Sequence, residues 1–187
     1  MTEEQYKDII KQKLTDKRYK HSLAVADEAK RLAKKYGADP EKAYVAGLLH
    51  DICKNTEVNI LLQTAKEFDI ILCSEEKAES KLLHARLGAE YVKRVLGVED
   101  IDIINAIRYH TTARADMPLF EKILYLADFT SSDRDYDGVE TMRRLVEKGI
   151  KPAMHEALVF TLKDLITREH AIHPDTVAAY NQIIIQH

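Results

Sequence analysis

The chain has 187 residues, and 28 lysines and arginines against 31 aspartates and glutamates give a formal net charge of −3. This near-neutral balance argues against binding to duplex nucleic acid, which requires an excess of basic residues. No apolar run approaches the length of a membrane span, and the charged N-terminus does not resemble a secretory signal, so we expect a soluble cytoplasmic protein. The two cysteines are not in a Cys-x-x-Cys arrangement, which fits a reducing compartment.

Apolar residues recur at helical spacing along nearly the whole chain, which predicts an all-α fold. The first helix is expected to end near Leu14, the second to run from about Arg18 to Tyr36, and the third to begin at Pro40 and end at His50-Asp51. Further helices are expected at about residues 57–68, 80–96, 100–110, 118–130, 138–148, 152–169 and 174–185. No linker, low-complexity tract or internal repeat divides the chain, so we expect one domain over residues 1–187.

Several expected helix ends carry residues of the capping type. Thr2 and Gln5 have the spacing of a capping box, and Gly37 is expected to end the second helix. Asp39 before Pro40 is typical of a helix start, because proline lacks the N–H group that the first turn leaves unpaired.

Polar residues of the metal-ligating type interrupt apolar helical sequence. His50-Asp51 directly follow a small apolar run, His21 is in phase with Val25 and Leu32, and Asp128 ends an otherwise apolar helix. Taken singly, each is more readily explained as a hydrogen-bonded core residue. Burying imidazoles and carboxylates is nevertheless costly unless they bind something, so four such residues in one small helical protein favour a metal site.

The order of these residues resembles the HD-domain superfamily of metal-dependent phosphohydrolases. Further segments resemble the YqeK family of bacterial symmetrical bis(5′-nucleosyl)-tetraphosphatases; they are residues 82–89, 106–112, 117–128, 133–139 and 172–176. The resemblance implies an all-α HD-domain helical bundle with two divalent metal ions. The metal ligands that it implies are His21, His50, Asp51, His84, His110 and Asp128. Iron is the expected metal, and manganese and zinc are the alternatives, because imidazole and carboxylate ligands suit all three.

The resemblance further implies cleavage of diadenosine tetraphosphate or a related dinucleoside tetraphosphate into two nucleoside diphosphates, ADP or GDP. Asp51, as the ligand that bridges the ions, and Lys54, as a phosphate contact, are the expected catalytic residues. Arg134 is the next choice for a phosphate contact, because its planar guanidinium can hold a phosphate through two hydrogen bonds. The expected substrate contacts are Arg18, His21, Lys54, Lys81, Thr111, Asp128, Arg134, Ala171, Ile172, His173, Pro174, Asp175 and Thr176.

For some residues the sequence allows more than one functional interpretation. A solvent-facing charge is the alternative for each of the cations and is nearly as good an explanation for Lys81. Thr111 could equally cap a helix end, and for His173 a base or ribose contact is favoured over metal binding. The apolar run 183–185 could pack internally or in a homodimer. The alternative functions are an HD phosphohydrolase acting on another nucleotide, such as a nucleotidase or nucleoside triphosphate hydrolase, and a catalytically silent nucleotide-binding module.

The sequence also departs from the family pattern away from the expected ligands. Ser131-Ser132 stand where the family commonly has Glu-Pro, Ala113 stands at a glycine position, and Ala85-Arg86 replace Gly-Pro. We expect these changes to affect substrate contacts rather than metal binding.

Overall fold

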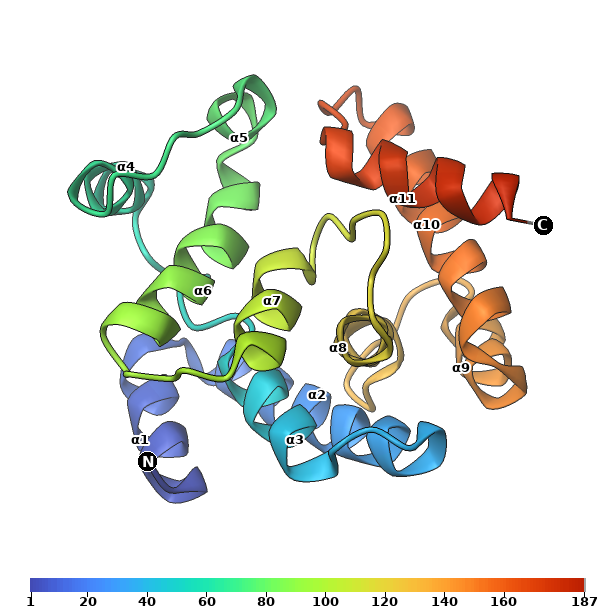
Figure 1. Cartoon of the computed structure of the whole chain (residues 1–187), viewed down its shortest axis with the longest axis horizontal. Coiled ribbons are helices and arrows are strands. Elements are labelled where there is room, and N and C mark those ends of the chain that lie inside the picture. Colours follow the sequence, from blue (N-terminus) through green and yellow to red (C-terminus); the bar gives the residue numbers. More distant parts are fainter. Residues whose placement is uncertain (187) are drawn as a thin grey trace.

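The computed structural model describes residues 1–186, which hold helices and connecting turns without a β-strand. Figure 1 shows their arrangement. The helices are α1 (Glu3–Lys13), α2 (Asp16–Tyr36), α3 (Pro40–Leu49), α4 (Val58–Glu67), α5 (Ser74–Ala78), the 3-10 turn η1 (Ser80–Leu82), α6 (Leu83–Arg94), α7 (Ile101–Tyr109), α8 (Leu119–Thr130), α9 (Val139–Lys148), α10 (Ile150–Thr167) and α11 (Pro174–Ile185). The prediction of an all-α fold is confirmed. No helix within residues 1–186 is both long and apolar enough to cross a membrane.

The predicted helix ends are confirmed where a capping residue marks them. Thr2 and Gln5 form the capping box of α1, and Gly37 ends α2 with a left-handed φ of 80°. Asp39 accepts hydrogen bonds from two backbone N–H groups of the first turn of α3. Helix α10 begins at Ile150, two residues earlier than predicted, so that Pro152 lies in its first turn, where a missing N–H costs little.

The segment between α4 and α6 differs from the prediction of one helix over residues 80–96. Helix α6 begins only at Leu83, and residues 74–82 form the short helix α5 and the turn η1. Cys73 caps α5 by accepting from the backbone N–H of Glu76, whose carboxylate in turn accepts from the backbone N–H of Cys73. These two hydrogen bonds stabilise a helix of five residues. The sequence of this helix lacks the apolar spacing that would have predicted it.

Helix α8 lies at the centre of the molecule, seen nearly end-on in Figure 1, and contacts α2, α3, α7, α9 and α10. Its residues 123–127 are all buried, as expected of a helix surrounded by other helices. Asp128 directly follows this buried run, so its carboxylate lies at the edge of the core.

Helices α2 and α3 approach each other closely at Gly47. A Cβ atom at this position would lie only 2.5 Å from Cα of Ala26, so only glycine fits here. The close approach brings His50, at the end of α3, beside His21 of α2, with ring centroids 5.3 Å apart. The packing of α3 on α2 thus assembles one half of a histidine cluster.

Candidate active site

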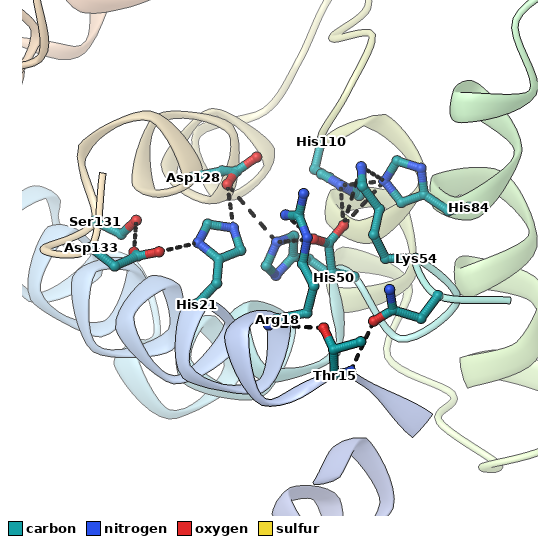
Figure 2. A network of polar contacts seen from close by, with 12 residues as sticks. Thr15, Arg18, His21, His50, Lys54, His84, His110, Asp128, Ser131 and Asp133 are labelled. Atoms are coloured by element: carbon teal, nitrogen blue, oxygen red, sulfur yellow. Dashed lines mark hydrogen bonds and ion pairs between the residues drawn. The ribbon is translucent and has the colours of Figure 1, made fainter. Parts of the chain in front are cut away.

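Six side chains from different parts of the chain converge beside α8. His21 comes from α2, His50 and Asp51 from the end of α3, and the remaining three, His84, His110 and Asp128, from α6, the end of α7 and α8. Figure 2 shows the row from His21 and Asp128 through His50 to His110 and His84. All are buried except Asp128, which is partly exposed. The structure therefore brings together every residue that the sequence predicts as a metal ligand.

Three of the four imidazoles are oriented in the same way. The Nδ1 atoms of His50, His84 and His110 donate hydrogen bonds to the carbonyl oxygens three residues earlier, at 2.7, 2.5 and 2.7 Å respectively. Because Nδ1 carries the proton, the neutral ring presents an Nε2 lone pair to the cluster. This is the tautomer in which a metal-binding histidine is held by a backbone carbonyl.

The cluster also contains buried polar atoms without partners. Among the described residues, Nε2 of His50 and Oδ1 of Asp51 make no hydrogen bond of acceptable geometry. Nε2 of His84 lies 3.1 Å from Oδ1 of Asp51, and Nε2 of His110 lies 3.6 Å from the same oxygen. Lone pairs directed at one another in a buried site are costly unless a cation lies between them, so the donor set fits divalent metal ions.

The ligand atoms form three overlapping groups, each with atoms within 4.8 Å of one another. The groups are His21, His50 and Asp51; His50, His110 and Asp128; and Asp51, His84 and His110. Asp51 belongs to the groups at both ends of the row. Its two carboxylate oxygens give it the means to contact two ions at once.

His21 is held between two carboxylates. Its Nε2 lies 2.9 Å from Oδ1 of Asp128, and its Nδ1 lies 2.8 Å from Oδ2 of Asp133. Burial lowers the pKa of His21, but the hydrogen bond and charge of Asp128 outweigh burial, so the pKa is raised. Asp133 fixes the ring in the orientation that turns Nε2 toward the cluster.

Asp133 was not among the residues expected at the site. It lies 112 positions from His21 in the sequence, and the signals for it were its place beside Arg134 and in the family-like segment 133–139. Oγ of Ser131, one of the departures from the family pattern, donates to the other oxygen of Asp133 at 2.7 Å. Ser131 therefore supports the site indirectly, through the carboxylate that orients His21.

The electrostatics around Asp51 favour an ionised carboxylate and neutral rings at His50 and His84. Burial raises the pKa of Asp51, but its neighbours His50, His110, His84 and Lys54 hold it well below its usual range. Burial lowers the pKa of His50 and of His84 to about 4. Each of these groups is thus in the protonation state that metal binding requires near neutral pH.

Three cations surround the cluster. Nη1 of Arg18 lies 3.0 Å from Oδ2 of Asp51, and Nζ of Lys54 lies 3.1 Å from Nε2 of His84. Arg134 forms an ion pair with Asp128, and its Nε donates to the carbonyl oxygen of the same residue at 2.6 Å. The predicted phosphate contacts Lys54, Arg134 and Arg18 thus lie beside the predicted metal ligands.

Several of the remaining predicted contacts share a cavity of about 180 Å³ next to the His84 and His110 end of the cluster. Its lining includes Lys81, Thr111, Ala171, His173 and Thr176. Oγ1 of Thr111 is buried and has no hydrogen-bond partner among the described residues.

The other three predicted contacts of the 171–176 turn, Ile172, Pro174 and Asp175, do not line this cavity. Pro174 is the first residue of α11, and the backbone N–H of Asp175 donates to Nδ1 of His173 at 3.1 Å. Pro174 thus begins α11, and Asp175 positions the ring of His173.

Cys73, Glu76 and His173 form a separate group whose atoms have metal-ligand spacing. Because Nδ1 of His173 accepts from Asp175, its Nε2 carries the proton and faces Sγ of Cys73 at 3.5 Å. The carboxylate of Glu76 is paired with Arg86 at 2.5 Å. The polar atoms of this group are already paired through hydrogen bonds and ion pairs. In the main cluster, by contrast, Nε2 of His50 and Oδ1 of Asp51 have no partner among the described residues.

Ala113, the residue at the expected glycine position, has φ 55°. It follows His110 and Thr111 and is fully buried. The left-handed conformation explains why glycine suits this position.

Comparisons with known proteins agree with this geometry. Residues 18–133 match the family model described as HD domain. The chain is 38% identical over 182 residues to the symmetrical bis(5′-nucleosyl)-tetraphosphatase of Halalkalibacterium halodurans, covering 95% of each chain, and 34% identical over 190 residues to that of Bacillus subtilis, covering 98% of each. A crystal structure titled as a predicted HD superfamily hydrolase involved in NAD metabolism, from Clostridium acetobutylicum, matches 100% of this chain and 99% of its own with 35% identity and a TM-score of 0.96.

Proposed function

Because the chain belongs to the HD domain family and to the family of symmetrical bis(5′-nucleosyl)-tetraphosphatases, we propose that it hydrolyses diadenosine tetraphosphate to two molecules of ADP. The observation that carries the proposal is the convergence of four histidines and two aspartates, three of the rings turning an unprotonated Nε2 toward the same space. Related dinucleoside tetraphosphates, which would release GDP or another nucleoside diphosphate, present the same phosphate chain. The activity is assigned to a single HD domain over residues 1–187.

We assign two divalent metal ions to the cluster, with iron as the first choice and manganese or zinc as alternatives. The ligands would be His21, His50, Asp51, His84, His110 and Asp128. When bound, such ions lower the pKa of water and stabilise negative charge on the attacking and leaving oxygens of a phosphoryl transfer. The overlap of the ligand groups at Asp51 supports a pair of ions with this residue between them.

The positively charged side chains around the cluster would bind the highly anionic substrate. Arg18, Lys54 and Arg134 now pair with residues of the cluster, and each would turn its donors to phosphate oxygens when the tetraphosphate binds. A nucleoside diphosphate is a good leaving group, so positioning and charge neutralisation supply most of the catalysis. Lys54 lies partly exposed beside Asp51 and His84, which suits contact with the central phosphates where the anhydride bond breaks.

Residues 171–176, together with Lys81 and Thr111, would hold one nucleoside of the substrate. Thr111 and His173 line one cavity together with Lys81, whose positive charge favours a phosphate group. His173 is assigned to base or ribose contact, because its Nδ1 is engaged by the backbone of Asp175.

A substrate panel tests the proposal. The metal-loaded protein is incubated separately with diadenosine tetraphosphate, AMP, ATP and a cyclic dinucleotide, and the products are separated by chromatography. We expect efficient conversion of diadenosine tetraphosphate to ADP. Intact diadenosine tetraphosphate together with cleavage of a mononucleotide would indicate a different HD phosphohydrolase, and full metal loading without any turnover would indicate a silent binding module.

A further inference from the structure

A larger cavity, of about 350 Å³, lies at the other end of the metal cluster. Its wall includes Asp128 and Arg134, so it opens directly onto the His21 end of the row. The cavity described above borders the opposite end, because it is lined by Leu82 and Thr111, near His84 and next to His110 in the chain. The cluster thus has cavities beside both of its ends.

The two cavities share a wall. Thr161, Asp164, Leu165 and Arg168, all in the last turns of α10 or just after it, line both of them. The end of α10 is therefore a ridge with a hollow on each side. A substrate with two similar ends joined by a phosphate chain could place one end in each hollow and its centre at the cluster.

The larger cavity has an aromatic wall made by Phe129, Tyr136 and Phe160. The ring centroids of Tyr136 and Phe160 are 5.0 Å apart, and those of Phe129 and Phe160 are 6.1 Å apart. The hydroxyl of Tyr136 donates to the carbonyl oxygen of Phe129 at 3.1 Å, which holds the ring in place. Phe160 is 37% exposed, so an apolar ring face is open to a bound molecule.

Polar and charged groups complete the lining. Arg134 lies between this cavity and the cluster, where it can hold the phosphate that adjoins the nucleoside. At the rim, Nε of Arg168 pairs with Oδ1 of Asp164 at 2.9 Å, offering both donors and an acceptor to a base or ribose. An aromatic platform next to a cationic group is the combination that binds a nucleobase and its phosphate in proteins that recognise single nucleotides.

We propose that the cavity walled by Phe129, Tyr136 and Phe160 is a second nucleoside site, which binds one half of the dinucleoside tetraphosphate while the Thr111 cavity binds the other. The inference rests on the proposed function, because it gives each half of the symmetrical substrate its own site. It also explains cleavage at the middle: with one nucleoside on each side of the α10 ridge, the central anhydride lies at the metal cluster. Phe160 is the residue on which the base stacks.

Calorimetric binding to the metal-loaded protein tests the inference without requiring turnover. The probe is the analogue of diadenosine tetraphosphate in which a methylene group replaces the central bridging oxygen, and the comparison ligand is adenosine 5′-tetraphosphate, which has one base. Loss of base stacking in Phe160→Ala should weaken binding of the two-base analogue by about 5- to 100-fold. Binding of adenosine 5′-tetraphosphate should change much less, because its single base can occupy the Thr111 cavity.

Two further variants separate stacking from folding. Phe160→Tyr keeps an aromatic face and should bind the analogue as the wild type does. Ile166→Ala removes another exposed apolar side chain of α10 that lines neither cavity, and it should have no effect. Unchanged analogue binding in Phe160→Ala, or an equal loss for both ligands, would overturn the second site. If the wild type binds the analogue in this way yet leaves diadenosine tetraphosphate intact, the proposed function fails while the second nucleoside site stands.

Discussion

Nε2 of His84 and Nε2 of His110 lie 3.3 Å apart, although the Nδ1 atom of each ring donates to a main-chain carbonyl. With both protons on Nδ1, two lone pairs face each other in a buried site. A cation relieves this repulsion, and in this structure the ammonium group of Lys54, 3.1 Å from Nε2 of His84, supplies the charge. The backbone thus fixes the rings in a state that demands a cation, which is the physical basis of the metal assignment.

Lys54→Ala should weaken substrate binding more than it slows the chemical step. The side chain would contribute a charge-assisted hydrogen bond to phosphate, so its loss should raise KM for diadenosine tetraphosphate by about 10- to 100-fold. Steady-state kinetics on the metal-loaded enzyme measure the effect, and Lys20→Ala, at an exposed position of α2, is the control. An unchanged KM would remove Lys54 from the substrate-binding residues.

Ala113→Gly should stabilise the protein. Ala113 has φ 55°, a left-handed conformation that costs a residue with a side chain about 1–2 kcal/mol and that glycine adopts freely. Glycine loses more entropy on folding, and the variant also loses one buried methyl group, so we expect a net gain of at most about 0.5 kcal/mol in the free energy of unfolding, measured by urea denaturation. Ala115→Gly, in the same loop but outside the positive-φ region, should give no such gain. A loss of stability in Ala113→Gly would contradict the backbone explanation.

Gly47→Ala should destabilise the fold and disturb the site together. The added Cβ would lie 2.5 Å from Cα of Ala26, so α3 must move away from α2, at a cost of about 1–3 kcal/mol. The matched control is Gly88→Ala in α6, where the nearest atom would be a side-chain carbon at an ordinary 3.6 Å. Thermal unfolding should show a lower Tm for Gly47→Ala only. Equal Tm values for the two variants would contradict the close packing of α2 and α3.

The metal-free protein should lose stability as the pH falls from about 6.5 to 4. Burial lowers the pKa of His50 and of His84 to about 4, whereas a histidine of the unfolded chain titrates near 6.5. In this range the unfolded chain binds more protons, so the free energy of unfolding decreases with falling pH, by at most about 3 kcal/mol for each ring. The raised pKa of His21 acts in the opposite direction: its stabilising effect is complete below pH 6.5 and is lost as the pH rises.

Urea denaturation of chelator-treated protein at several pH values measures this dependence. His84→Gln, which cannot take up a proton, should show a shallower loss of stability than the wild type. Stability that stays constant between pH 6.5 and 4 would contradict the burial of neutral rings.

Much of the fold follows from local sequence signals. Periodic apolar residues predict most helices, and Asp39-Pro40 and Gly37 mark ends that the structure confirms. Helix α5 has no such signal, because its five residues Ser74–Ala78 are mostly polar and depend on the reciprocal cap of Cys73 and Glu76.

The site could be predicted only in part. The order of the histidines and aspartates indicates the cluster, because residues of these types are costly to bury alone. The contact between His21 and Asp133 joins residues 112 positions apart and depends on how α2 packs beside the loop after α8. The aromatic wall of the second cavity likewise combines Phe129, Tyr136 and Phe160 from separate elements, each of which is also typical of an ordinary core residue.

The most direct test of the central assignment measures metal content and ADP formation on the same samples. Metal-free wild-type protein and Asp51→Asn are titrated with Fe²⁺ or Mn²⁺ without oxygen, and bound metal and the products from diadenosine tetraphosphate are quantified at each step. We expect ADP formation by the wild type to rise with bound metal up to two ions per chain, and Asp51→Asn to lose both metal and activity. ADP formation by protein without bound metal, or full metal retention in Asp51→Asn, would contradict the assignment of the cluster as the catalytic metal centre.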